Sequence, residues 1–319
     1  LLGNPGIDVN LPDFDGVTPL MFSVVLQQPK ITNMLIGHES INVNMQTKLD
    51  GSTALILAAK EFDVKLVEVL LECKDIDVNI MDEDLYTAFM HALSRHIDDH
   101  ILNKLLDRET NDINHQAADG KSMLLIACDN NKLEIIEKLL KSERLNINLT
   151  DNYDRTALIY ASQKGHLQAV KMLMNHQGID INLQDTDGHS ALSLAILNDN
   201  EEVTNFMLNF EEINLALKNK EGNTTLMFAI ENGNSKLVQD LLSHPNKTFS
   251  QEDYIKAYNA ALENDLEEVL PDIESNLDVQ SKQMIEKSQT VQPLNLKPEE
   301  EYIEDKLTEV NEECRFVLW

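Results

Sequence analysis

The stretch INLQDTDGHSALSLA, residues 181 to 195, contains residue types that could bind a metal ion. Asp185 and Asp187 have the spacing of the first and third ligands of a calcium-binding loop. Such a loop also needs Gly at its sixth position, for a sharp turn, and Glu at its twelfth, as a bidentate ligand. This sequence has Ser190 and Ile196 in those places. We therefore predict no calcium site here.

The same stretch contains Gly188-His189-Ser190, the order of residues in a hydrolase nucleophile turn. That turn needs a second Gly two residues after the Ser, where this sequence has Leu192, and a buried strand leading into it. We expect Ser190 to cap a helix instead. The segment SQKGH, residues 162 to 166, lacks the upstream Gly of a phosphate-binding loop. The sequence predicts no enzyme and no cofactor.

A third group of potential ligands lies in the segment HALSRHIDDH and consists of His91, His96, Asp99 and His100. His96 and His100 have the spacing of two ligands on one helix, but the pattern of the chain places a turn between helices there. No fourth ligand is provided for a tetrahedral metal ion. We predict surface histidines and no metal site.

The chain is strongly acidic, with 55 Asp and Glu against 26 Lys and Arg in 319 residues and a formal net charge of -29. Its field repels phosphate, which makes nucleic acid a poor partner. No apolar run reaches the roughly 18 residues that span a bilayer. Cys73, Cys128 and Cys314 lie far apart without CxxC spacing, as is typical of free thiols in a reducing compartment. We expect a soluble, monomeric, cytoplasmic protein.

The elements that position these residues follow from an internal repeat. Segments such as Ile76-Asp77-Val78-Asn79 recur, and their last Asn comes at steps of 34, 35, 35, 34 and 34 residues. A turn position follows each segment, and a hydroxyl residue usually follows two residues later. The turn positions are Gly16, Gly51, Leu85, Gly120, Asp154, Gly188 and Gly222. The hydroxyl residues are Thr18, Thr53, Thr87, Ser122, Thr156, Ser190 and Thr224.

The unit that begins at Asp151 shows what the repeat builds. Thr156 precedes an apolar run, and its oxygen can accept a hydrogen bond from an unpaired backbone N–H at a helix start. Leu158 and Ala161 share one helix face, and Gly165 ends the helix where a left-handed turn is needed. A second helix follows. Because both helices are short, each pair must pack against its neighbours.

These units resemble the ankyrin repeat, whose signature is a Gly turn, Thr-Pro-Leu-His-x-Ala, a helix hairpin, a second helix ending in Leu-Leu, and Asp-Val-Asn. The first half matches DGVTPLMFS (15–23), DGSTALILAA (50–59), DGHSALSLA (187–195) and EGNTTLMFA (221–229). The second half matches VKLVEVLLECKDIDVN (64–79) and LEIIEKLLKSERLNIN (133–148). The resemblance implies an all-α solenoid of helix-turn-helix units with short β-hairpin turns.

The sequence departs from the family at the His of the signature. Its place is taken by Met21, Ile56, Met90, Leu125, Ile159, Ser193 and Met227. We expect mainly apolar packing to replace the hydrogen bonds of that His.

The repeat divides the chain into three parts. Residues 1–245 contain a partial first ankyrin repeat and then seven more. Residues 246–280 form a degenerate capping repeat, in which Ser250 and Asp253 predict a helix start and Leu277-Asp278-Val279 replaces the strand-like ending. Since the chain begins with the end of a repeat, we expect it to be a fragment of a longer protein.

Residues 281–319 form an acidic C-terminal tail. Pro293 and Pro298 interrupt the pattern, and the Glu-rich segment KPEEEYIEDKLTEVNEECRFVLW ends in apolar residues. One interpretation is a flexible tail or a helix docked on the last repeat. The other is a resemblance to C-terminal export signals of type IV effectors that intracellular bacteria inject into host cells, and only the order of composition supports it.

The residue directly after each turn position forms a row, because it occurs once per repeat and stacks roughly 10 Å from the next. The row consists of Val17, Ser52, Tyr86, Lys121, Arg155, His189 and Asn223. Lys121, Arg155 and His189 are basic or can become so. One interpretation is that they contact an acidic stretch of a partner. The other is that they neutralise acidic neighbours such as Asp119, Asp154 and Asp187.

Tyr and Arg residues near this row are candidate binding residues, because these types dominate the energetics of protein interfaces. Tyr86 and Tyr153 belong to hairpin tips, and Arg95 and Lys164 precede the turn between helices. The predicted partner-binding residues are Tyr86, Arg95, Lys121, Tyr153, Arg155, Lys164 and His189.

The resemblance implies a non-enzymatic scaffold that binds a partner protein on a concave ankyrin surface. If the tail is an export signal, the protein is a bacterial effector that acts in the host cytoplasm. The alternative is a spacer or targeting array for a catalytic domain outside this chain.

Overall fold

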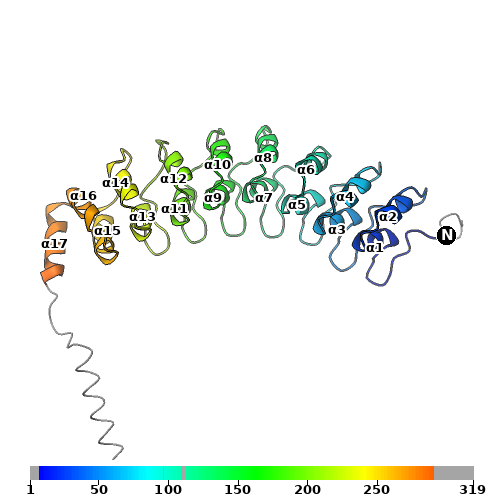
Figure 1. The fold of residues 1–319 in the computed structure, drawn as a ribbon, viewed down its shortest axis with the longest axis horizontal. Helices are drawn as coiled ribbons and strands as arrows, with labels where there is room; N and C mark the ends of the chain where they lie inside the picture. The colour runs from blue at the N-terminus through cyan, green and yellow to red at the C-terminus, as the bar shows by residue number, and fades with distance from the viewer. Residues whose placement is uncertain (1–6, 96, 109–111, 291–319) are drawn as a thin grey trace, which may run out of the picture.

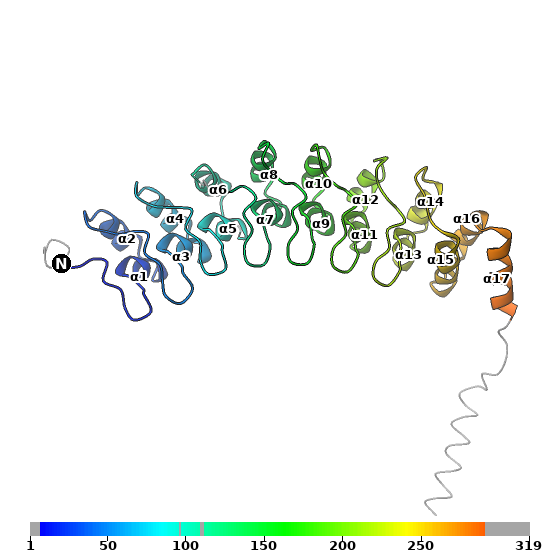
Figure 2. The same ribbon diagram turned by 180° about the vertical axis from the view of Figure 1, so that it is seen from behind.

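The protein is a curved row of helix pairs (Figures 1 and 2). The computed structural model describes residues 7–95, 97–108 and 112–290. Within these residues, the first helix of each pair and the hairpin before it lie on the concave side of the arc, and the second helix lies on the convex side. The substantial helix contacts join members of one pair or of neighbouring pairs. The predicted all-α solenoid is confirmed.

We number seven units by their helix pairs. The pairs are α1 (Pro19–Val25) with α2 (Pro29–Ile36), α3 (Ala54–Lys60) with α4 (Val64–Leu71), α5 (Ala88–Leu93) with α6 (Asp99–Leu106), α7 (Met123–Asp129) with α8 (Leu133–Leu140), α9 (Ala157–Gln163) with α10 (Leu167–Met174), α11 (Ala191–Leu197) with α12 (Glu201–Met207), and α13 (Thr225–Glu231) with α14 (Ser235–Ser243). A last group of helices follows α14.

The first helix of each unit begins directly after the predicted hydroxyl residue. The oxygen of Thr156, for example, accepts a hydrogen bond from the N–H of Ile159 at 3.2 Å. The same cap forms at Thr18, Thr53, Thr87, Ser122 and Ser190. The prediction is wrong for the side chain of Thr224, whose buried oxygen has no hydrogen-bond partner in the described chain. There the adjacent Thr225 donates its hydroxyl to the carbonyl of Leu215 at 2.6 Å and anchors the helix start.

The seven predicted turn positions all adopt a left-handed backbone. At the five glycines φ lies between 70° and 82°, whereas Leu85 and Asp154 have φ of 61° and 57°. These two values match the usual left-handed conformation, which a side chain tolerates at a cost of about 1 kcal/mol. Across four of the hairpins, single β-bridges replace strands: Met81 with Thr87, Gln116 with Ser122, Thr150 with Thr156 and Gln184 with Ser190.

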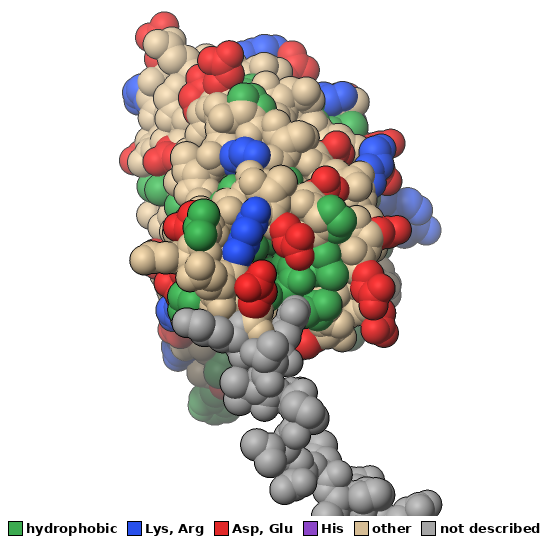
Figure 3. Space-filling view, turned by 90° about the vertical axis from the view of Figure 1, so that its left-hand side faces the viewer, with side chains coloured by type: hydrophobic (Ala, Val, Ile, Leu, Met, Phe, Trp, Pro, Cys, Tyr) green, Lys and Arg blue, Asp and Glu red, His purple; other side chains and the backbone are tan. Residues whose placement is uncertain are grey.

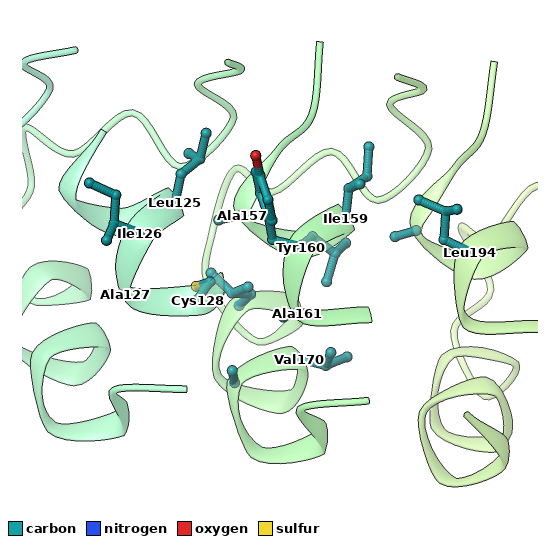
Figure 4. Packing of buried hydrophobic residues seen from close by; sticks show 14 of the residues in the cluster. Leu125, Ile126, Ala127, Cys128, Ala157, Ile159, Tyr160, Ala161, Val170 and Leu194 are labelled. Carbon is teal, nitrogen blue, oxygen red and sulfur yellow. The ribbon is translucent and has the colours of Figure 1, made fainter. Parts of the chain in front are cut away.

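The core lies between the two helix layers and between neighbouring units. Figure 4 shows Leu125 of α7 and Ile159 of α9 at the same level of successive helices, and both side chains are fully buried. They occupy two of the positions at which the signature has His, so apolar packing replaces it there. Ser193 is an exception, because its hydroxyl donates to the carbonyl of Ser190 at 2.9 Å.

At five of its positions, the recurring Asn of the Asp-Val-Asn segment joins one repeat to the next. Asn148 donates its side-chain N–H to the carbonyl of Gly178 at 2.8 Å, and its Oδ1 accepts from the N–H of Asp180 at 2.9 Å. The same pair of bonds forms at Asn10, Asn44, Asn114 and Asn182. The 34-residue spacing of the Asn therefore reflects a ladder of side-chain bonds between units.

Replacing Asn148 by Ala should lower the free energy of unfolding by about 1.5 kcal/mol, because two partly exposed hydrogen bonds are lost. Urea denaturation followed by circular dichroism measures this change. Asn175 is the matched control: its side chain donates to Lys171 within the same helix end, so Asn175→Ala should stay within about 0.5 kcal/mol. Equal losses in both variants would contradict a role for the ladder.

The chain after α14 forms a last group of helices: α15 (Gln251–Glu263), η1 (Glu267–Val269), α16 (Leu270–Ser275) and α17 (Val279–Thr290). The predicted helix start is confirmed, because Ser250 and Asp253 form a reciprocal capping box. The strand-like ending predicted at Leu277-Asp278-Val279 is wrong. Asp278 accepts a hydrogen bond from the N–H of Ser281 at 2.7 Å and thereby starts α17 at Val279.

The predicted tail begins inside α17, where Ser281 and Ile285 are buried and the helix contacts α15. Figure 3 faces this end of the molecule and shows apolar side chains in a patch bordered by acidic ones. The Glu-rich part of the predicted tail lies outside the described residues, so neither interpretation of the tail is tested. No helix in the described ranges is long and apolar enough to cross a bilayer.

Candidate functional site

The hairpin tips on the concave side are joined in a continuous backbone ladder. In each case the N–H of one tip donates to a carbonyl of the tip before it, at 2.8 to 3.1 Å. The pairs are Lys48 with Asp15, Glu83 with Asp50, Ala118 with Asp84, Asn152 with Asp119, Thr186 with Tyr153 and Lys220 with Asp187. The ladder fixes the spacing of the row of residues that follows the turn positions.

Five of the seven predicted binding residues line two adjoining cavities at the centre of the array. One cavity, of about 370 Å³, is lined by Lys121, Arg155 and Lys164 together with Asp129, Tyr160, Gln163 and Asn198. The other, of about 250 Å³, is lined by Tyr153, Arg155 and His189 together with Gln163, Asp185, Thr186, Asp187 and Leu194. Because Arg155 and Gln163 belong to both, we call the two cavities the central groove.

Arg155 is a fixed cation in the middle of the central groove. Its guanidinium carbon lies 4.9 Å from the ring centroid of Tyr153 and 4.7 Å from that of Tyr160. Nε and Nη2 approach Oδ2 of Asp151 at 3.0 and 2.8 Å. Nη1 has no acceptor among the described residues, so one edge of the guanidinium can donate to a ligand. Stacking and pairing hold that edge in place before any ligand arrives.

Asp151 holds this arrangement together and was not among the predicted residues. Its side chain is 1% exposed, its Oδ1 accepts from the N–H groups of Tyr153 and Arg155, and its Oδ2 accepts from the hydroxyl of Tyr160 at 2.7 Å. Burial alone would raise the pKa of Asp151, but hydrogen bonds from Tyr160 and Arg155 outweigh it and lower the pKa. Asp151 is therefore ionised at neutral pH and committed to its own unit.

Lys121 and Lys164 flank Arg155 and are paired only loosely. Their Nζ atoms lie 3.9 and 4.0 Å from the two carboxylate oxygens of Asp129, beyond hydrogen-bond distance. The neutralising neighbours are thus Asp129 and Asp151. The prediction of Asp119, Asp154 and Asp187 in this role is wrong. The hairpin brings Asp151 opposite Arg155, and α7 supplies Asp129 both to Lys121 of its own unit and to Lys164 of the next unit.

His189 is less exposed than its place in the row implies. Its ring packs on Phe228 of the next unit, with 5.5 Å between centroids, and its backbone N–H donates to Oδ1 of Asp185 at 2.8 Å. Its Nδ1 is buried and has no hydrogen-bond partner within the described part of the chain. His189 therefore forms a wall of the central groove.

Tyr86 and Arg95, the other two predicted residues, line neither cavity. The hydroxyl of Tyr86 donates to Asp119 at 2.9 Å, and burial together with this bond raises its pKa. The guanidinium of Arg95 lies over the ring of Phe62, 4.7 Å from its centroid. The structure places them in unit 3, apart from the other five.

A buried ion network that the sequence did not predict joins units 2 and 3. The side chain of Asp82 is 1% exposed, and its Oδ2 lies 3.0 Å from Nζ of Lys60 and 2.7 Å from Nε2 of His91. Burial lowers the pKa of His91, which favours the neutral ring. The prediction of a surface histidine is therefore wrong for His91. It is correct for His100, which is exposed in α6, and His96 lies outside the described residues.

The motif from Asp185 to Ser190 has a structural role at each position. Oδ1 of Asp185 accepts from the N–H groups of Asp187 and His189 and closes the hairpin. The oxygen of Ser190 accepts from the N–H of Ser193 and caps α11. Among the described residues, no group of three or more His, Cys, Asp or Glu is placed to hold a metal ion.

Comparisons with known proteins agree with this architecture. A family model described as ankyrin repeats (3 copies) matches residues 1–82, 20–101, 89–185 and 174–253. Alpha-latroinsectotoxin-Lt1a of Latrodectus tredecimguttatus is 32% identical over 128 residues, which cover 38% of this chain. The match spans 9% of that protein's length.

A solved structure with a similar fold is the ankyrin repeat domain of Bcl-3, described as a unique member of the IkappaB protein family. The TM-score is 0.53 and the sequence identity is 25%. The match covers 67% of this chain and 94% of the Bcl-3 chain.

Proposed function

The chain belongs to the ankyrin-repeat family, and on this premise we propose that it is a scaffold that binds a partner protein in the central groove. Ankyrin repeats generally act as protein-interaction modules. The observation that supports this site is the convergence of Lys121, Tyr153, Arg155, Lys164 and His189 on one concave region.

The partner residue that enters the larger cavity is acidic. Lys121, Arg155 and Lys164 line this cavity with a single carboxylate, that of Asp129, whereas the chain as a whole has a net charge of -29. The donors of both lysines and the outer edge of Arg155 are available to a carboxylate, and such charge-assisted bonds are strong. The tyrosine rings around Arg155 supply the aromatic contact area that is common at interface hot spots.

The double variant Lys121→Glu with Lys164→Glu should abolish capture of the principal partner, because it reverses both flexible cations of the cavity. The full chain serves as bait in lysate of the source cells, with mass spectrometry as the readout. We expect at least about a tenfold loss of capture. The melting temperature should change by only a few degrees, since neither lysine forms a close ion pair. Arg155 is left intact because its removal would strand the buried Asp151.

The matched control is Lys138→Glu with Lys141→Glu, which changes the charge equally at α8 on the convex side. Capture by this control should be unchanged. Equal losses in both variants would indicate non-specific attraction to charge, and undiminished capture by Lys121→Glu with Lys164→Glu would favour a spacer whose groove binds nothing.

A further inference from the structure

Unit 1 and the hairpin of unit 2 present a second surface on the concave side, formed by apolar side chains. Phe14 at the first tip is 99% exposed, and Leu49 at the second tip is 80% exposed. Leu26, Val25 and Phe22, at the end of α1, are 64%, 50% and 45% exposed. We call these five residues the N-terminal apolar surface.

The counterparts of Val25 and Leu26 in units 2 to 7 are exposed or half-buried, and at the position of Val25 unit 6 has the half-buried Leu197. In the later units the place of Leu26 is taken by Glu61, Arg95, Asn130, Lys164, Asn198 and Asn232, of which Lys164 lines the central groove. Only unit 1 has an aliphatic residue there. Ile31 of α2 and Phe22 of α1 behave differently, because their counterparts in later units are buried between units. Examples are Leu66 and Ile101 for Ile31, and Ile126 and Phe228 for Phe22. Packing between units therefore accounts for Ile31 and Phe22 but not for Leu26.

A comparison of the hairpin tips shows that packing between units does not account for Phe14 either. The counterparts of Phe14 in units 2 to 7 are the residues whose backbone N–H donates to the preceding tip. They are Lys48, Glu83, Ala118, Asn152, Thr186 and Lys220. All are exposed or half-buried. Leu49 is an extra residue, because the second hairpin closes from Thr47 to Ser52 and is one residue longer than the first, which closes from Asp13 to Val17. Large apolar side chains are thus added where the fold does not need them.

Exposed carboxylates lie on the same and the adjoining elements: on the first hairpin, directly after α3, and on the third hairpin, whose tip bonds to the second. Asp13, Asp15, Glu61, Glu83 and Asp84 are all exposed. No Lys or Arg in the described ranges lies within 4.0 Å of any of them. The nearest tip cation, Lys48, directs its Nζ to the carbonyl of Phe14 at 3.4 Å. Apolar area framed by unpaired negative charge is complementary to a segment with apolar and basic side chains.

We propose that the N-terminal apolar surface binds an amphipathic, basic segment of a partner protein. Its apolar side chains cover Phe14, Leu26 and Leu49, and its Lys or Arg side chains pair with Asp15, Glu83 and Asp84. The proposal rests on the proposed function only in assigning protein binding to the concave face. The N-terminal apolar surface differs from the central groove in its residues and in the sign of the charge that it selects.

A dye-labelled model peptide, KLLKKLLKKLLK, tests this surface against the full chain by fluorescence anisotropy. Phe14→Ser with Leu49→Ser should weaken binding by about tenfold, because two exposed apolar contacts are lost. Asp15→Asn with Glu83→Gln and Asp84→Asn should weaken it by about fivefold at low ionic strength and less at high ionic strength. The peptides ELLEELLEELLE and KQQKKQQKKQQK should bind at least about tenfold more weakly, since each lacks one of the two chemistries.

Matched controls separate this surface from the general acidity of the chain. Val279→Ser with Met284→Ser removes two exposed apolar side chains at the other end, and Glu201→Gln with Glu202→Gln and Asp240→Asn removes three exposed charges from the convex side. Both should leave peptide binding within about twofold. Equal losses in these controls, or unchanged binding by Phe14→Ser with Leu49→Ser, would overturn the proposal.

Two further outcomes decide between occupants and between sites. A dimer in solution that Phe14→Ser with Leu49→Ser converts to a monomer would assign the surface to a second copy of this chain and overturn the proposal. Lys121→Glu with Lys164→Glu should not weaken peptide binding. If those groove substitutions do not affect partner capture while the peptide results hold, the central groove fails and the N-terminal apolar surface stands.

Discussion

Replacing Asp151 by Ala should lower the free energy of unfolding by about 4 kcal/mol. The substitution leaves the guanidinium of Arg155, the hydroxyl of Tyr160 and two backbone N–H groups without the acceptor they share. Removing one partner of a buried ion pair is costly because the other charge remains desolvated. Urea denaturation followed by circular dichroism measures the loss, and unit 5 should unfold before its neighbours.

The pH dependence of the stability of the Asp151→Asn variant tests whether the negative charge of Asp151 causes this stabilisation. The pKa of Asp151 is lower in the folded chain than in the unfolded one, where it is about 3.9. The ionised carboxylate therefore stabilises the fold above about pH 4, and this contribution is lost as the pH falls towards the folded pKa. The stability difference between wild type and Asp151→Asn should be full at pH 7 and should shrink below about pH 4.

Asp187 provides the control for Asp151, because it is an exposed carboxylate at the next hairpin tip whose nearest cation, Lys220, lies 4.0 Å away. Asp187→Ala should change the free energy of unfolding by less than about 0.5 kcal/mol. A loss below about 1 kcal/mol for Asp151→Ala would show that the network of Asp151, Arg155 and Tyr160 contributes little to folding.

Replacing Gly120 by Ala should lower the free energy of unfolding by about 3 kcal/mol. Gly120 has φ of +82°, and a Cβ added there would lie 2.6 Å from the backbone nitrogen of Asn152 in the next hairpin. The cost combines left-handed strain with a clash that only a shift of the hairpin can relieve. Because the shift separates the tips of units 4 and 5, the variant should also weaken partner capture at Lys121 and Arg155.

The Gly233→Ala variant separates the cost of left-handed strain from the cost of the clash. It has φ of +68°, but nothing lies within 4 Å of a Cβ added there. Gly233→Ala should therefore show the strain alone, about 1 kcal/mol. Thermal and urea unfolding of both variants test the difference, and equal losses would mean that the close approach of Gly120 to Asn152 is relieved without cost.

The fold was largely predictable because the same local pattern recurs in every repeat. A turn residue followed by a hydroxyl residue predicts where a helix begins, and the structure agrees even at Leu85 and Asp154, where Gly is missing. The errors lie where local patterns compete. Leu277-Asp278-Val279 resembles the ending of a repeat, but Asp278 starts a helix instead. At Thr224 the neighbouring hydroxyl of Thr225 provides the anchor.

The candidate site was less predictable because the fold determines which acidic side chains lie next to its cations. The row of Lys121, Arg155 and His189 follows from the repeat, but its acidic partners Asp129 and Asp151 do not. A signal for Asp151 does exist, since Asp or Asn occurs three residues before the turn position at Asp13, Asp82, Asp151, Asp185 and Asn219. In each case its Oδ1 accepts a backbone N–H across the hairpin. Burial of Asp151 and the stacking of Arg155 required the three-dimensional arrangement.

The restriction of substantial contacts to neighbouring units has a consequence for folding kinetics. No loop much longer than one repeat, 34 or 35 residues, has to close before native contacts form. The entropy of chain closure, which slows proteins with distant contacts, therefore does not grow with the number of units. Any adjacent pair of units can serve as a nucleus, from which order spreads in both directions. Added repeats would provide more starting points for folding without raising its barrier.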